Sequence, residues 1–169
     1  MAKTTLLNII SLLVLVTGCR AIDDTCIACL CEFISYGTEC NFMVGCQNGV
    51  CGPYGITMPF WIDAGSPTIN GAVPSSSEYQ QCAVDVKCAE TTIRNYMTRY
   101  SQDCNGDGKV DCLDIAAIHA NGPFGCRNPL RVGSTTALQN CLDRSNSITD
   151  GDSRDAEMID VRLSKYQDY

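Results

Sequence analysis

Apolar side chains recur every three or four residues between residues 77 and 100, which places them on one face of a helix. Two shorter apolar stretches, residues 26–34 and 112–120, also favour helices. Asp24 or Thr25 can cap the first of these, and an Asn-Gly-Pro sequence ends the last. The pattern therefore predicts a mostly helical domain.

The segments between these helices are rich in glycine, proline and cysteine and show little periodicity. Residues 40–56 predict loops or a short hairpin, and residues 65–77 predict a surface loop. The tail, residues 142–169, is acidic and lacks cysteine, so we expect it to be disordered or weakly helical. The expected fold class is α+β: a small disulfide-rich domain, mostly helical, with a short β-hairpin or loop region.

The N-terminal segment, residues 1–21, has the pattern of a secretory signal peptide. One lysine precedes an apolar run that is too short to span a bilayer comfortably, and small residues near Ala21 suit cleavage. We therefore expect a folded domain over residues 22–141. A competing interpretation is a bacterial lipoprotein box ending at Cys19, which would carry a lipid.

Cysteine parity supports an exported protein. Of 13 cysteines, Cys19 lies in the leader, and an even number remains. These are Cys26, Cys29, Cys31, Cys40, Cys46, Cys51, Cys82, Cys88, Cys104, Cys112, Cys126 and Cys141. Such a set predicts up to six disulfides and an extracellular location. A zinc site is disfavoured because the chain has 1 histidine.

The net charge of −7 argues against nucleic acid as a partner, because that requires a basic face. No later apolar run is long enough for a membrane helix, so we expect no membrane contact after signal cleavage. We expect a monomer.

Four blocks of sequence carry a family resemblance. They are Cys26-x2-Cys29-x-Cys31-Glu32; Gly45-Cys46 followed by Cys51-Gly52-Pro53-Tyr54-Gly55-Ile56-x3-Phe60-Trp61-Ile62-Asp63; Tyr96-Met97-x-Arg99-Tyr100; and Cys112-x-Asp114-Ile115-Ala116-x2-His119-x2-Gly122-Pro123-x-Gly125-Cys126. In order and spacing they resemble the invertebrate-type (destabilase-like) lysozymes. The resemblance implies hydrolysis of the β-1,4 bonds between N-acetylmuramic acid and N-acetylglucosamine in peptidoglycan, without a cofactor. Some family members are also credited with an isopeptidase activity.

The family's catalytic carboxylate pair has no counterpart here. Glycoside hydrolysis requires two carboxyl groups, one as acid and one as nucleophile or stabiliser. By the resemblance, Ile34 stands at the family's Glu position, followed by Ser35 as in the family. The family's Asp is also absent, because no acid lies near Asn48. Glu39 and Asp63 are the candidate substitutes.

The resemblance also suggests residues that contact the sugar. Tyr54 and Trp61 could stack on it, Asp63 could line the groove, and His119 matches the family's histidine. Each also has a structural interpretation: Trp61 as core, Asp63 as a surface or capping residue, His119 as a structural histidine. Gly55 replaces the family's usual glutamine, which removes one donor and one acceptor for sugar hydroxyls.

Family resemblance and short spacing together suggest four disulfides. They are Cys31–Cys40, Cys46–Cys51, Cys82–Cys88 and Cys104–Cys126. The cysteines that remain, Cys26, Cys29, Cys112 and Cys141, allow three connectivities. Two further family cysteines are replaced by Ala64 and Thr92, which preserves parity if they are bonded to each other in relatives.

Residues 103–114 follow the twelve-residue calcium-loop pattern. The ligand positions one, three, five, seven, nine and twelve hold Asp103, Asn105, Asp107, Lys109, Asp111 and Asp114. Gly108 stands at position six, where the loop turns sharply. The pattern predicts a structural calcium ion. The alternative is an acidic turn in which Asp111 caps the following helix.

The sequence thus favours a secreted homologue that binds peptidoglycan or a related amino-sugar glycan, or has a regulatory role, without hydrolysis. The alternatives are an active muramidase that uses a displaced carboxylate, and an isopeptidase-type hydrolase that uses Ser35.

Overall fold

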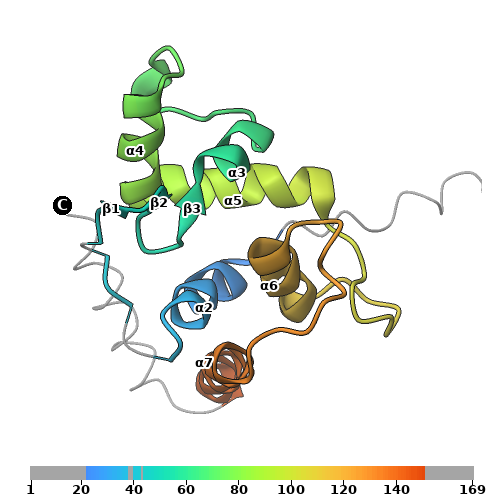
Figure 1. Ribbon diagram of the computed structural model, residues 1–169. Helices are drawn as coiled ribbons and strands as arrows, with labels where there is room; N and C mark the ends of the chain where they lie inside the picture. The colour runs from blue at the N-terminus through green and yellow to red at the C-terminus, as the bar shows by residue number, and fades with distance from the viewer. Residues whose placement is uncertain (1–21, 38–39, 43, 151–169) are drawn as a thin grey trace, which may run out of the picture.

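The computed structural model describes residues 22–37, 40–42 and 44–150 (Figure 1). The predicted signal peptide, Glu39 and residues 151–169 of the tail lie outside the described residues.

The described chain is mostly helical and carries a small antiparallel sheet, which confirms the expected fold class. In chain order the elements are α2 (Asp24–Ile34), β1 (Cys46–Gln47), β2 (Val50–Cys51), β3 (Ile56–Thr57), α3 (Met58–Asp63), a 3-10 turn η1 (Ile69–Gly71), α4 (Ser76–Val84), α5 (Val86–Tyr100), α6 (Cys112–Asn121) and α7 (Val132–Asp150). In Figure 1, α2 and α6 lie between α5 on one side and α7 on the other. No helix in the described part of the chain is long and apolar enough to cross a membrane.

Helix α2 forms the centre of the core. It buries Ile27, Leu30 and Phe33 and packs along α7. Its N-cap is Asp23, whose side chain accepts a hydrogen bond from the amide of Cys26 at 2.6 Å. The expected cap, Asp24 or Thr25, was therefore one or two residues too late.

The single helix expected over residues 77–100 is wrong. The chain leaves helical geometry at Asp85, which has φ −77° and ψ 121°. Asp85 caps α5 by accepting a hydrogen bond from the amide of Cys88 at 2.8 Å. The apolar spacing continues across this break, which is why periodicity alone did not reveal it.

The hairpin of β1 and β2 turns at Asn48 and Gly49, which have φ 52° and 79°. Two successive left-handed residues of this kind suit the twist of a tight hairpin. Strand β3 then pairs antiparallel with β2, with Cys51 opposite Ile56. Gly52, with φ 72°, follows the hairpin, and a Cβ there would lie 1.7 Å from the carbonyl oxygen of Ala83. The hairpin is therefore fixed against α4 by close backbone packing.

Six disulfides connect the described elements. All four predicted pairs are present: Cys31–Cys40, Cys46–Cys51, Cys82–Cys88 and Cys104–Cys126. The two pairs that had been left open are Cys26–Cys112 and Cys29–Cys141, which join α2 to α6 and to α7. These two bonds close loops of 86 and 112 residues. Because a disulfide restricts the unfolded chain more when the loop is longer, each stabilises the fold by roughly 4 to 5 kcal/mol.

Helix α7 was not predicted. It begins at Val132, buries Leu138 completely, and continues to Asp150, beyond Cys141. Residues 142–150, the first part of the expected tail, are therefore helical.

Candidate functional site

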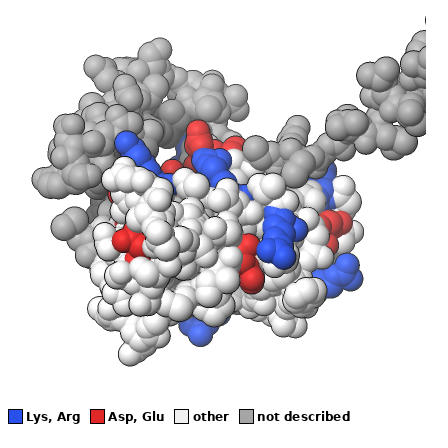
Figure 2. Space-filling model, turned by 90° about the horizontal axis from the view of Figure 1, so that it is seen from above, with Lys and Arg blue, Asp and Glu red and all other residues white. Residues whose placement is uncertain are grey.

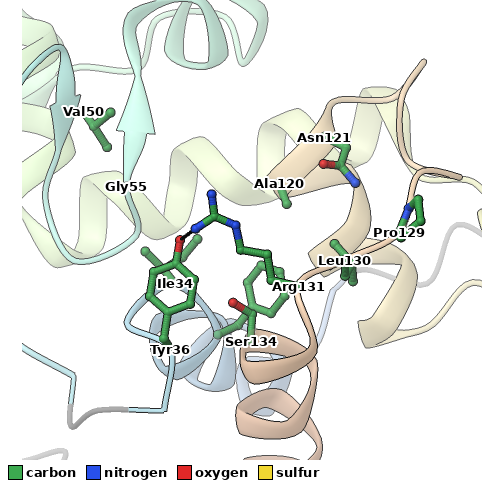
Figure 3. A pocket seen from close by; sticks show the side chains of 11 residues that line it. Ile34, Tyr36, Val50, Gly55, Ala120, Asn121, Pro129, Leu130, Arg131 and Ser134 are labelled. Atoms are coloured by element: carbon green, nitrogen blue, oxygen red, sulfur yellow. Dashed lines mark hydrogen bonds between the residues drawn. The ribbon is translucent and has the colours of Figure 1, made fainter.

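A cleft of about 380 Å³ opens where the end of α2, the hairpin, the end of α6 and the start of α7 meet (Figure 3). It is lined by Phe33, Ile34, Tyr36, Val50, Gly55, Ala120, Asn121, Pro129, Leu130, Arg131 and Ser134. These residues come from four separate segments, so the cleft exists only in the folded chain.

Ile34, the residue at the family's Glu position, lies in this cleft. It is the last residue of α2, and Gly55 faces it from the turn between β2 and β3. A Cβ on Gly55 would lie 3.3 Å from Cγ2 of Ile34 and 3.5 Å from Cγ1 of Val50. The space beside Gly55 is therefore already filled by two apolar groups, and a side chain there would crowd Ile34.

The cleft has one charged side chain among its described lining residues, and it is basic. Neither aspartate nor glutamate lines it, and the charge comes from Arg131. The Arg131 guanidinium donates a hydrogen bond to the hydroxyl of Tyr36 and lies 5.4 Å from the centre of its ring (Figure 3). This part of the cleft can attract an anion but has no carboxyl group for proton transfer.

Ser134 contributes a polar group to the cleft from the first turn of α7. Its side chain is buried, with 4% of the residue exposed. The neighbouring hydroxyls of Thr135 and Thr136 donate to the carbonyls of Arg131 and Val132. Ser134 makes no comparable bond to a described residue, and its oxygen points into the cleft (Figure 3).

Tyr54 and Trp61, proposed to stack on a sugar, lie in the core. They are 1% and 3% exposed. The Tyr54 hydroxyl donates to Glu90 at 3.2 Å, and the Trp61 indole donates to the carbonyl of Pro67 at 2.7 Å. Burial raises the pKa of Tyr54, with a further contribution from the charge of Glu90. In this conformation both rings stabilise the fold and are not accessible to a sugar.

Asp63 and His119 also lie outside the cleft lining. Asp63 is exposed at the end of α3. Nε2 of His119 lies 2.8 Å from the carbonyl oxygen of Tyr54, so it donates there, and the ring meets Phe60 edge-on at 5.0 Å. Its Nδ1 is buried without a partner among the described residues. Burial lowers the pKa of His119, so the ring is a neutral structural donor.

The predicted calcium loop is closed by its own amides. Asp103 accepts hydrogen bonds from Gly106 at 2.6 Å and Gly108 at 2.9 Å, which lower the pKa of Asp103. Asn105 and Asp107 accept from the amides two residues ahead, each at 2.9 Å.

Asp114, at the twelfth position of this loop, is buried and engaged with the backbone. It accepts from the amides of Cys104 and Asp111, both at 2.9 Å. Asp111 in turn caps α6, as the alternative interpretation required. Within the described residues no three Asp, Glu, His or Cys side chains converge as a metal site. Calcium binding remains a prediction that the geometry does not require.

Charge elsewhere on the molecule is mixed. On the face shown in Figure 2, basic and acidic side chains are interspersed among uncharged ones, and no continuous basic stripe is visible on its described part. Two ion pairs join described residues, Arg94 with Asp24 and Arg144 with Glu32.

Comparison with known proteins gives the family. Residues 23–141 match the family model described as Destabilase. The chain belongs to the destabilase family of invertebrate-type lysozymes. It is 33% identical over 118 residues to Invertebrate-type lysozyme 3 of Caenorhabditis elegans, covering 69% of this chain and 84% of that protein. It is 33% identical over 143 residues to a lysozyme of Magallana gigas, with 79% and 93% covered.

Solved structures agree with this assignment. The inhibitor-bound lysozyme from Meretrix lusoria superposes with a TM-score of 0.53 at 27% identity, covering 71% of this chain and 90% of that chain. The family resemblance inferred from sequence is thus confirmed, and the activity of the family is that of a muramidase.

Sequence reasoning missed three residues that line the cleft of this invertebrate-type lysozyme homologue: Tyr36, Arg131 and Ser134. Tyr36 lies two residues after Ile34 in the sequence, and this closeness was a signal that it also lines the cleft. Arg131 and Ser134 belong to no motif, and they reach the cleft because α7 packs against α2.

Proposed function

We propose that this protein is a secreted, non-hydrolytic homologue of the invertebrate-type lysozymes that binds peptidoglycan or a related amino-sugar glycan in the cleft beside Ile34. The observation that carries the proposal is the absence of a carboxylate among the described residues of that cleft. Both the family relationship and the retained cleft support a glycan as the ligand.

The chemistry of the cleft opposes hydrolysis. A retaining glycosidase holds two carboxyl groups about 5 to 5.5 Å apart on either side of the bond, and one must deliver a proton. An isoleucine at the acid's position can neither donate nor accept that proton. Of the nearby acids, Glu32 is paired with Arg144 at 2.7 Å, and Asp63 lies outside the cleft.

Secretion is part of the proposal and is supported by the six disulfides, which require an oxidising compartment.

An apolar floor with a few polar groups at its edge is typical of a pre-formed ligand site. Ile34 and Val50 supply that floor, and Arg131 and Ser134 supply the polar edge.

Co-sedimentation with insoluble peptidoglycan tests the proposal, with turbidity followed in the same suspension. We expect the mature protein to sediment with the glycan while the turbidity stays constant. An Ala120→Trp variant fills the cleft and should lose binding, whereas Ala28→Trp, on the exposed face of α2, should retain it. Clearing of the suspension would favour a displaced carboxylate, with Glu39 and Asp63 as the next variants, and absence of binding would refute the glycan ligand.

A further inference from the structure

The basic edge of the cleft has an unused capacity for hydrogen bonds. Arg131 carries five guanidinium N–H donors, and the structure gives the group a bond to Tyr36. Arg131 is exposed and forms no ion pair with another described residue, unlike Arg94 and Arg144. Donors therefore remain for a planar anion, and carboxylates bind arginine through two parallel hydrogen bonds.

The start of α7 adds to this capacity. The first amides of a helix have no acceptor within the helix, and its dipole places partial positive charge there. Helix α7 has 19 residues and begins directly after Arg131. An anion held by Arg131 would lie beside this helix end, where backbone N–H groups stabilise negative charge.

Ser134 is a second polar group at this helix end, independent of Arg131. Only 4% of Ser134 is exposed, and its hydroxyl has no hydrogen bond to a described residue. Because this hydroxyl opens onto the cleft, a ligand oxygen that enters the cleft can accept its hydrogen bond in place of water. Figure 3 shows this hydroxyl and the Arg131 side chain facing the same part of the cleft.

Other residues that line the cleft suit a sugar ring. Ile34, Val50 and Leu130 present apolar surface, and Tyr36, which is 56% exposed, offers an aromatic face beside Arg131. A neutral sugar that covered Arg131 would remove water from the guanidinium without replacing its hydrogen bonds, which disfavours neutral ligands.

We propose that the cleft selects an amino-sugar glycan that carries a free carboxylate, and that Arg131, Ser134 and the first turn of α7 bind this carboxylate. The selection rests on the proposed glycan-binding function, and within peptidoglycan it favours muramic acids whose lactyl carboxylate carries no peptide. It replaces the acidic cleft needed for hydrolysis by a basic one. The sugar then lies against Ile34 and Tyr36 while its acid group faces α7.

A matched pair of ligands tests the selection by calorimetry at low salt. One is the disaccharide of N-acetylglucosamine and N-acetylmuramic acid with its lactyl carboxylate free, and the other is the same disaccharide as the carboxamide. We expect the carboxylate to bind about tenfold more tightly, and the difference to shrink as salt is added. Arg131→Gln should abolish the difference, and Ser134→Ala should reduce it several-fold.

Arg127→Gln is the matched control, because Arg127 is exposed and does not line the cleft. It should leave the difference unchanged. Equal binding of the two ligands would overturn the selection while glycan binding stood. Failure of both ligands to bind would overturn the proposed function and the selection together. Discrimination that survives Arg131→Gln would overturn the assignment to Arg131.

Discussion

Replacement of Asp114 by alanine should destabilise the domain strongly, whether or not calcium is present. The Asp114 carboxylate is 1% exposed and accepts hydrogen bonds from the amides of Cys104 and Asp111 at 2.9 Å and of Asn105 at 3.4 Å. Alanine leaves these amides, which belong to the loop before α6, without their acceptor. A buried amide without a partner, such as that of Cys104, costs about 1 to 3 kcal/mol, and the partly buried amides of Asp111 and Asn105 cost less, so we expect a total of about 3 kcal/mol.

Thermal unfolding of purified variants measures this loss. For a domain of this size, 3 kcal/mol corresponds to a fall in Tm of roughly 10 to 15 °C. Asp107→Ala is the control, because Asp107 is exposed and accepts a hydrogen bond from the Lys109 amide at 2.9 Å, so we expect a loss below about 1 kcal/mol. A Tm for Asp114→Ala within 3 °C of the parent, on the scale of about 4 °C per kcal/mol, would refute this reasoning.

Three other features of the molecule, His119, Gly52 and the acidic loop, can be tested by substitution. Burial lowers the pKa of His119 in the folded state, so on acidification the unfolded chain binds the proton at a higher pH than the folded chain does. The contribution of His119 to the free energy of unfolding should therefore be complete above about pH 6.5. Below that pH the free energy of unfolding should fall by at most about 1.4 kcal/mol per pH unit. A His119→Gln variant followed by denaturant unfolding from pH 7.5 to 5 should lose this part of the dependence, and an unchanged slope would contradict it. Gly52→Ala places a Cβ 1.7 Å from a carbonyl oxygen and should cost more than about 3 kcal/mol, whereas Gly49→Ala, with no atom within 4 Å, should cost about 1 kcal/mol; equal unfolding midpoints would contradict the packing argument. If the loop of residues 103–114 binds calcium, millimolar calcium should raise Tm and Asp103→Asn should remove the increase, while no change with calcium supports the acidic turn.

The parts of the fold that sequence predicted are those with a local signal. Helices α2 and α6 have strong apolar stretches with nearby caps, and the disulfides of short spacing followed from the family pattern. The break at Asp85 was missed because Asp85 resembles a solvent-facing helix residue, and its role as a cap shows only in the backbone. Helix α7 was missed because its pattern is weak and its stability depends on burial of Leu138 and on the bond from Cys29 to Cys141.

The site was predictable at one residue and not as a whole. The family pattern placed Ile34 at the catalytic position, and the structure places Ile34 in the cleft. The same pattern suggested Tyr54 and Trp61 as sugar contacts, but hydrogen bonds to Glu90 and Pro67 hold both rings in the core. Arg131 reaches the cleft from a distant segment that has no motif, and single-sequence patterns do not report such contacts.

The most direct test of the central claim measures binding and bond cleavage in the same tube. Mature protein is incubated with purified peptidoglycan, and the fraction of protein in the pellet is compared with the reducing sugar ends released into solution. The proposed glycan binding predicts a substantial pelleted fraction, and the absence of a carboxylate from the described cleft lining predicts no reducing ends above the buffer control. Reducing ends that increase with protein concentration and time would contradict a non-hydrolytic cleft.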